Sequence, residues 1–150
     1  MSGSIFHGTS DTEVIAYLLT QNRLLTPNIE MAVSRTMDDI EGAYSLVIMT
    51  HTKLIAARDP NGFRPLCIGE VDGSIMFASE SCAFPVLGGH LIREVEPGEV
   101  VVADLGAGTY RSVPSGIKAR SSLCMFEFIY FSRADSVIDG ASVDLVRLEA

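Results

Sequence analysis

The sequence lacks tryptophan, has only 3 cysteines in 150 residues, and contains no apolar run long enough to cross a bilayer. So few and such widely spaced cysteines argue against a disulfide framework or a local zinc site. The start shows neither the basic nor the apolar region of a signal peptide. Positive charge is scarce as well, because 11 Lys and Arg stand against 19 Asp and Glu, a net charge of -8. These absences predict a cytoplasmic protein that binds neither nucleic acid nor membrane.

The composition is 47% hydrophobic and 20% charged, which is typical of one globular domain with a sizeable core. Two helices are predicted near its start. Ser10-Asp11-Thr12-Glu13 matches the capping box S-x-x-E, and the apolar residues that follow predict a helix from Asp11 to Gln21. A second helix is predicted to begin with Pro27 in its first position and to end near Gly42. Its apolar face would hold Ile29, Val33, Met37 and Ile40, with Glu30 on the solvated face.

From residue 43 the pattern indicates strands, which are predicted at 44–49, 54–57, 66–69, 75–78, 91–95 and 99–104. The 44–49 run is almost continuously apolar, as expected of a strand buried on both faces. Asp72-Gly73 is a hairpin signal, and residues 105–122 are interpreted as a hairpin tip and a loose linker. Together these elements predict an α+β fold with a largely antiparallel sheet.

The last third of the chain holds its most aromatic stretch, 124–131, where alternation favours a strand with Phe126, Phe128 and Tyr130 on one face. Ser79-Glu80-Ser81 is expected to cap a short helix from 83 to 87. Ser142 is expected to cap a final helix from Val143 to Glu149.

One connection between two predicted strands has the composition of a rigid turn: Arg58-Asp59-Pro60-Asn61-Gly62-Phe63-Arg64-Pro65-Leu66. Its prolines fix φ and Gly62 permits a positive φ, so it can reverse the chain rigidly while presenting two arginines and an aspartate. No phosphate loop, zinc set or dinucleotide fingerprint is present. The pattern alone therefore predicts an α+β domain with a charged turn, and no reaction.

The turn resembles the R-D-x-x-G-x-[RK]-P-L signature of class II glutamine amidotransferases. Five further blocks are similar to those of the amidophosphoribosyltransferase family, which opens purine synthesis: 9–13, 41–45, 79–83, 93–99 and 126–133. The resemblance implies an N-terminal-nucleophile hydrolase sandwich, with antiparallel sheets and flanking helices, of which this chain would be the latter part. The expected domain organisation is thus a partial amidotransferase domain over 1–150, without the nucleophile-bearing start and without the C-terminal phosphoribosyltransferase domain.

The resemblance also implies an enzyme that makes 5-phosphoribosylamine from phosphoribosyl pyrophosphate and glutamine. The nucleophilic cysteine of that family has no counterpart here, so no catalytic residue is assigned and the chain alone is expected to be inactive. Magnesium and, in some members, a 4Fe–4S cluster serve the full-length enzyme; no cofactor is expected for this chain alone. Its expected partners are glutamine and the missing parts of its own enzyme, with a homo-oligomer at full length.

Site residues follow from the matching positions. Asp11 falls where the family's aspartate holds the glutamine α-ammonium; from the pattern alone it would only complement the helix dipole. Cys124 falls where cluster-containing members have one iron–sulfur ligand, and a structural cysteine is the alternative. The positions Arg58, Asp59, Gly62 and Arg64 are expected to be scaffold, with a buried Arg–Asp pair fixing the strand connection.

Two other functions remain open at this point: a non-catalytic binding module on an amidotransferase scaffold, and a piece of another class II amidotransferase, of the glucosamine-phosphate synthase or asparagine synthetase type. Ala134 departs from the family pattern, which has proline there. A sheet edge without its neighbour is expected to expose apolar surface and to favour self-association.

Overall fold

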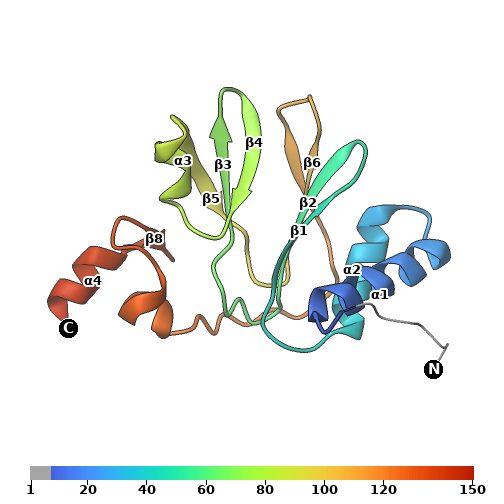
Figure 1. Ribbon diagram of the computed structural model, residues 1–150, viewed down its shortest axis with the longest axis horizontal. Helices are drawn as coiled ribbons and strands as arrows, with labels where there is room; N and C mark the ends of the chain where they lie inside the picture. Colours follow the sequence, from blue (N-terminus) through green and yellow to red (C-terminus); the bar gives the residue numbers. More distant parts are fainter. Residues whose placement is uncertain (1–7) are drawn as a thin grey trace. The chain divides into compact units, whose positions relative to one another are not determined.

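The computed structural model describes residues 8–150 and divides the chain into two units, residues 1–42 and residues 43–150. In the first unit, α1 (Asp11–Leu25) packs against α2 (Ile29–Asp39) (Figure 1). Buried Asn22 joins the two helices, because its Nδ2 donates to Thr36 Oγ1 at 3.2 Å and to Asp39 Oδ2 at 2.7 Å.

The helix starts differ from the prediction. Ser10 precedes α1 without a side-chain cap, and the Glu13 carboxylate accepts the N–H of Gly8 at 2.9 Å instead of closing a capping box. The start of α2 is set by Asn28, whose side chain accepts the N–H of Met31 at 2.9 Å, so Pro27 lies outside the helix.

The predicted apolar face of α2 is correct at Val33 and Met37, which are buried. Glu30 was expected on the solvated face, and that prediction is wrong, because Glu30 is only 4% exposed. Its position in the first turn places it beside the buried stripe rather than opposite to it.

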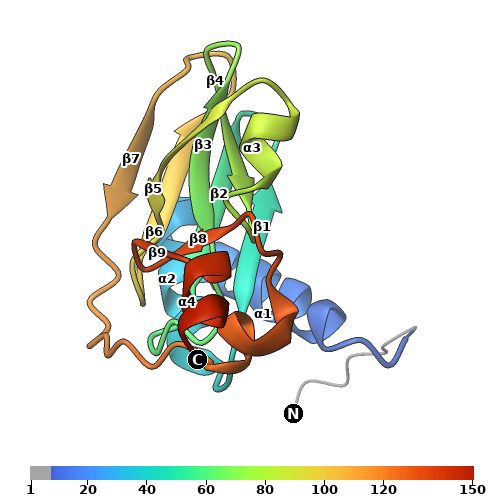
Figure 2. The same cartoon turned by 90° about the vertical axis from the view of Figure 1, so that its left-hand side faces the viewer.

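The second unit contains two main antiparallel sheets (Figure 2). One has the order β1-β2-β6-β7: β1 (Ser45–Met49), β2 (Lys53–Arg58), β6 (Val100–Asp104) and β7 (Tyr110–Val113). The other has the order β4-β3-β5: β3 (Cys67–Val71), β4 (Ser74–Ala78) and β5 (His90–Glu94). The Asp72-Gly73 hairpin is confirmed, with φ of 50° and 74° at its two residues. The α+β prediction with antiparallel sheets is confirmed.

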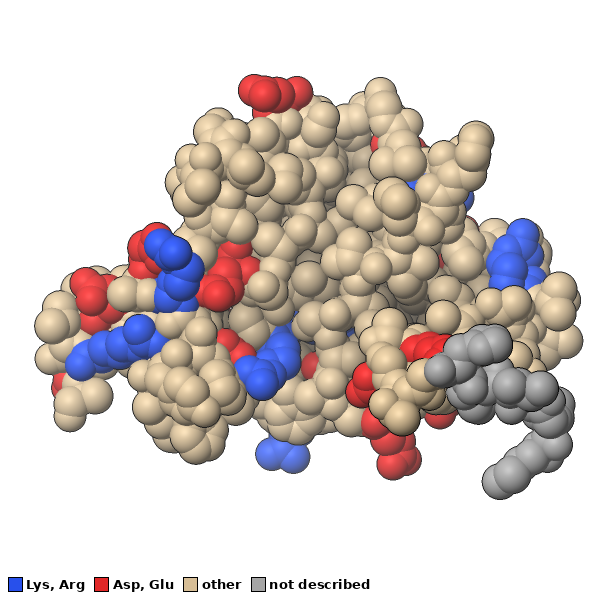
Figure 3. All heavy atoms as spheres, in the orientation of Figure 1, with Lys and Arg blue, Asp and Glu red and all other residues tan. Residues whose placement is uncertain are grey.

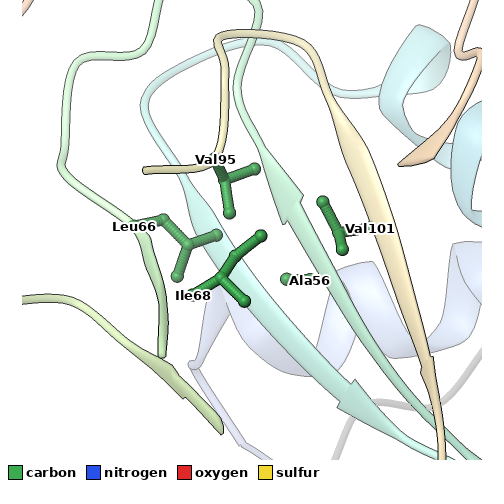
Figure 4. Close-up of a cluster of buried hydrophobic side chains, with 5 residues drawn as sticks. All are labelled: Ala56, Leu66, Ile68, Val95 and Val101. Carbon is green, nitrogen blue, oxygen red and sulfur yellow. The ribbon is translucent and has the colours of Figure 1, made fainter. Parts of the chain in front are cut away.

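The core lies between these sheets. Ala56 and Val101 come from one sheet, and Ile68 comes from the other with its flanking residues Leu66 and Val95 (Figure 4). All five are at most 2% exposed, so the two apolar faces bury each other as in a sandwich. The connection from β5 to β6 through Pro97-Gly98 therefore passes from one sheet to the other and is not a hairpin.

β1 is less buried than predicted. It is an end strand of its sheet within the described residues, and Val47 and Met49 are 50% and 76% exposed. A continuous apolar run does not distinguish a central strand from an end strand, because periodicity reports composition and not neighbours.

The carboxyl-terminal region forms α3 (Ala83–Val86), the π-helical turn η1 (Glu127–Phe131), the short pair β8 (Val137–Ile138) and β9 (Ala141–Ser142), and α4 (Val143–Glu149). The predicted aromatic strand is wrong, since the Ser132 N–H donates to the Glu127 carbonyl at 3.1 Å and closes a helical turn. The Ser142 cap is confirmed by its bond to the N–H of Leu145.

Acidic and basic side chains are interspersed on the part of the second unit that carries α4 (Figure 3). No helix among residues 8–150 is both long and apolar enough to span a membrane.

The two sheets are also joined by a polar contact. Arg93 of β5 donates to both carboxylate oxygens of Glu99, at 2.8 and 2.7 Å, and its guanidinium lies 5.6 Å from the centre of the Tyr110 ring in β7. Burial raises the pKa of Glu99, but hydrogen bonds from Arg93 and Ser112 outweigh it and lower that pKa. For Glu94, burial raises the pKa and outweighs the opposing effects of the Asp139 N–H and the Arg58 guanidinium.

These two carboxylates are expected to give opposite effects on stability. Glu99 stabilises the fold above the unfolded pKa and loses that contribution as the pH falls through its lowered folded pKa, so Glu99→Gln should destabilise at pH 7 and be neutral in strong acid. Ionised Glu94 disfavours the fold at neutral pH, so Glu94→Gln should stabilise there and gain nothing in strong acid. Urea unfolding across pH measures both. Shifts of the same sign for the two variants would contradict the assignment.

Candidate functional site

Asp11 lies in the first turn of α1, where the positive end of the helix dipole favours a carboxylate. Its Oδ1 accepts the N–H of Thr12 at 3.0 Å, and the residue is exposed to solvent. The backbone therefore orients the carboxylate while leaving it accessible to a positively charged group.

Arg58 ends β2 with its side chain only 3% exposed. Its Nε donates to the carbonyl of Arg64 at 2.8 Å, its Nη1 to that of Val95 at 2.6 Å, and its Nη2 to that of Gly62 at 3.1 Å. The planar set of guanidinium donors thus fixes the turn from within and ties it to the end of β5.

Asp59 is fully buried and organises the same turn. Its Oδ1 accepts the N–H of Asn61 at 2.9 Å, and its Oδ2 accepts the N–H of Phe63 at 3.1 Å. The expected Arg58–Asp59 pair is not formed. Each of the two side chains binds backbone groups instead, because a tight turn leaves carbonyls and N–H groups without ladder partners.

Gly62 has a φ of 59°, and a Cβ at this position would lie 2.7 Å from Pro97 Cγ. The N–H of the next residue, Gly98, donates to the carbonyls of Arg58 and Asp59 at 3.2 and 3.0 Å. The Pro97-Gly98 connection therefore rests directly on the turn, which only glycine permits at position 62.

A second segment runs along the turn. The N–H groups of Arg120, Ser122 and Cys124 donate to carbonyls within 60–63, at 2.9, 2.7 and 3.1 Å. The interpretation of this region as a loose linker is therefore wrong. Its Gly, Ser and Pro content predicted irregular backbone, but not that the turn would supply the hydrogen-bond acceptors.

Arg64 connects the turn to η1. Its guanidinium donates to the Glu127 carboxylate and lies 4.3 Å from the centre of the Phe131 ring. The bond to Glu127 raises the pKa of Arg64. Glu127 is 4% exposed, and its other oxygen accepts the Ser132 hydroxyl at 2.6 Å. These groups border a hollow of about 300 Å³ that also reaches Glu80.

Glu80 fixes the segment that follows η1. Its Oε2 accepts the N–H of Arg133 at 2.7 Å and the hydroxyl of Ser136 at 2.8 Å, while Ser81 Oγ accepts the N–H of Val137. Ser79-Glu80-Ser81 therefore does not cap α3, which begins without a side-chain cap. Sequence reasoning missed these roles of Glu80 and Glu127. A single carboxylate inside an aromatic stretch was the available signal for Glu127.

The three cysteines are free thiols in different settings. Cys67 is fully buried in β3, and burial raises the pKa of its thiol to about 12. Cys82 and Cys124 are half-buried. Within residues 8–150 no three His, Cys, Asp or Glu side chains gather into a metal-binding group.

The structure therefore brings Arg58, Asp59, Gly62, Arg64 and Cys124 together around one turn of the second unit. Asp11 belongs to the first unit.

Comparison with a family model, with curated relatives and with solved structures gives concordant matches. A family model described as "Glutamine amidotransferase domain" matches residues 1–85, more than half of the chain. The amidophosphoribosyltransferase of Methanocaldococcus jannaschii is 41% identical over 98% of this chain and 34% of the relative. That of Bacillus subtilis is 43% identical over 97% of this chain and 30% of the relative.

A solved structure of the B. subtilis glutamine phosphoribosylpyrophosphate amidotransferase, complexed with ADP and GMP, matches with a TM-score of 0.86 at 42% identity. The match covers 94% of this chain and 30% of the neighbour. The chain thus spans about a third of the length of the relatives it matches. The family match over more than half of the sequence, and the agreement of the fold with a solved amidotransferase, place this chain in the glutamine amidotransferase domain family.

Proposed function

We propose that this chain is part of the glutaminase domain of an amidophosphoribosyltransferase. The whole enzyme would transfer the amide nitrogen of glutamine to phosphoribosyl pyrophosphate and give 5-phosphoribosylamine. The observation that carries the proposal is the identity of 41–43% to amidophosphoribosyltransferases along 97–98% of the chain. Residues 1–150 would then be a partial amidotransferase domain of a cytoplasmic, homo-oligomeric enzyme.

Within that domain, Asp11 is our candidate for the ligand of the glutamine α-ammonium. An exposed carboxylate held by the N–H of Thr12 suits this role, since a charge-assisted hydrogen bond to an ammonium is stronger than a neutral one. The resemblance assigns no role to the neighbouring Glu13, whose carboxylate accepts the N–H of Gly8.

The chain alone would not hydrolyse glutamine. The family's nucleophile is a cysteine whose own α-amino group acts as base. Cys67 is a buried thiol inside β3, and neither Cys82 nor Cys124 carries a free α-amino group. The part of the domain described here would therefore position glutamine, and other parts of the whole enzyme would supply the nucleophile.

The test joins this chain to the remainder of the B. subtilis relative, in place of the region it matches, and measures phosphoribosylamine formation with glutamine or with ammonia. The joined protein should use both nitrogen sources. Asp11→Ala should lower kcat/KM for glutamine about 10- to 100-fold, the value of one charged hydrogen bond, and leave the ammonia reaction unchanged.

Glu13→Ala is the matched control, an acidic residue of the same helical turn, and it should change neither reaction appreciably. An equal loss of both reactions in Asp11→Ala would indicate a structural role for Asp11. A joined protein that uses ammonia but never glutamine would overturn the proposed function.

Amidophosphoribosyltransferases are a family that generally uses metal cofactors. We propose magnesium for the phosphoribosyl transfer of the whole enzyme, and Cys124 as one thiolate ligand if that enzyme holds a 4Fe–4S cluster. Cys124 suits this role because it is a free, half-buried thiol whose backbone is fixed by the Phe63 carbonyl. Such a cluster needs four ligands, so the described residues would supply one and the remaining protein the others.

A further inference from the structure

The turn of the β8–β9 hairpin is attached to β5 through a carboxylate. The N–H of Asp139, in this turn, donates to Oε1 of Glu94 at 2.6 Å, at the end of β5 (Figure 2). Asp139 has a φ of 49° and Gly140 has a φ of 75°, so both residues of the turn lie in the left-handed region. The acceptor is therefore an acidic side chain, and the residue that binds it is acidic as well.

The second oxygen of Glu94 is buried without a hydrogen bond. The side chain is 16% exposed, and its Oε2 has no hydrogen-bond partner among the described residues. Arg58 Nη1 lies 3.7 Å from that oxygen, but the Arg58 guanidinium donates to three backbone carbonyls instead. Arg93, which borders the same cavity, is engaged by Glu99. Ionised Glu94 is thus poorly compensated, since a buried charge needs hydrogen-bond donors as well as a nearby cation.

The other groups around Glu94 supply no positive charge. Cys67 lies opposite Glu94 in the β3–β5 pair, and burial raises the pKa of its thiol to about 12, so the thiol stays neutral. Ser121 and the exposed Glu96 border the adjoining cavity, which has a volume of about 340 Å³. Burial raises the pKa of Glu94, and the Asp139 carboxylate raises it further by its charge and by a side-chain hydrogen bond.

We infer that Glu94 and Asp139 form a proton-dependent latch between β5 and the turn of the β8–β9 hairpin. When the pair holds one proton, taken from solvent at the exposed Asp139, a carboxyl group meets a carboxylate and a hydrogen bond joins the two side chains. When both groups are ionised, two like charges lie beside the same N–H···O bond and the turn loosens from β5. Because the pKa of Glu94 is raised in the closed form, the latch is closed at low pH and opens as the pH rises through that pKa.

The opening is confined to the turn. Val137, at the start of β8, donates its N–H to Ser81 Oγ at 2.7 Å, and Ile138 is 1% exposed. These contacts contain no titrating group, so they hold β8 in place while residues 139 and 140 move. Both of these residues border the cavity beside Glu94, which the loosened turn would open to solvent.

The test follows the whole chain by NMR from about pH 3 to about pH 8. The side-chain carboxyl carbon of Glu94 should titrate at a higher pH than an ordinary glutamate, and the amide resonances of Asp139 and Gly140 should shift with the same midpoint. Protection of the Asp139 amide against hydrogen exchange should fall at least about tenfold on opening. Protection of the Val137 amide should not change across this transition, because its acceptor is the Ser81 hydroxyl.

Three variants separate the latch from general effects of pH. Glu94→Gln keeps an acceptor for the Asp139 N–H and carries an amide donor in place of the proton, so the turn should stay closed at every pH. Asp139→Asn keeps the N–H and tolerates a positive φ, and it should move the midpoint of Glu94 to lower pH. Glu96→Gln is the matched control, an acidic residue at the same cavity, and it should leave that midpoint unchanged.

Three results would each overturn the inference. The first is a Glu94 midpoint no higher than that of an ordinary glutamate. The second is protection of the Asp139 amide that does not depend on pH in the unmodified chain, or that is lost in Glu94→Gln. The third is an equal displacement of the Glu94 midpoint by Asp139→Asn and Glu96→Gln, which would show that the total charge and not the pair sets it.

Discussion

Arg58→Ala should lower the free energy of unfolding of the second unit by about 3–5 kcal/mol, the usual cost of removing one member of a buried, hydrogen-bonded polar network. The variant would leave the buried bonds to the carbonyls of Gly62 and Val95, and the half-buried bond to that of Arg64, without their donor. It would also leave Glu94, whose Oε2 lies 3.7 Å from Arg58 Nη1, without its nearby cation. The turn and the end of β5 would separate.

Urea unfolding followed by circular dichroism measures this loss. Arg58→Lys should recover only part of it, because one ammonium on a flexible stem cannot reach three carbonyls in the geometry of a guanidinium. Arg120→Ala is the control, since Arg120 is exposed and only its backbone N–H binds the turn. Similar losses for Arg58→Ala and Arg120→Ala would show that the buried guanidinium network is not what holds the turn.

Gly69→Ala should destabilise the fold by about 3 kcal/mol, at the upper end of the cost of overpacking a core. A Cβ on Gly69 would lie 2.3–2.5 Å from three carbons of the Phe84 ring, which belongs to α3 and is fully buried. The backbone of Gly69 has no unusual φ, so the penalty is purely steric. The pairing of β3 with β5 also shifts register between Ile68 and Gly69, at the position where the Phe84 ring contacts β3.

A double-mutant cycle separates this contact from general damage to β3. Phe84→Ala alone should cost about 3–5 kcal/mol through the cavity that it leaves. Gly69→Ala combined with Phe84→Ala should cost clearly less than the sum, because the new methyl group would occupy space that the ring has vacated. Strict additivity of the two changes would show that Gly69→Ala acts elsewhere than on the Phe84 ring.

Local sequence signals predicted the elements whose stabilising groups are themselves local. The Asp72-Gly73 hairpin and the Ser142 cap use residues within one turn of each other, and both are confirmed. The capping box failed because the Glu13 carboxylate binds Gly8 instead of Ser10. Ser79-Glu80-Ser81 failed as a cap because its oxygens bind a segment more than 50 residues later. The residue types that cap helices are the same types that accept long-range hydrogen bonds, so the local sequence does not distinguish the two roles.

The candidate site shows the same division. Resemblance to a family identified Asp11 and the residues of the turn as candidates. From the pattern alone, Asp11 would only complement the helix dipole, and the turn would be an ordered loop with no assigned role. It did not indicate how Arg58 and Asp59 act, since their partners are backbone groups that no motif encodes. Nor did it reveal Glu127, whose importance depends on Arg64 lying beside it in space.

The contacts of the Arg58–Leu66 turn have a consequence for synthesis. Although the turn is short, Arg58 binds the carbonyl of a residue 37 positions later, and Arg64 binds the side-chain carboxylate of a residue 63 positions later. A ribosome adds about 5–20 residues per second, so the turn would wait several seconds for its last partner. During that interval β1 and β2 would be exposed as an unfinished hairpin. The nascent chain is therefore most vulnerable to aggregation just before Glu127 emerges, and a chaperone that shields the β1–β2 hairpin would act in that window.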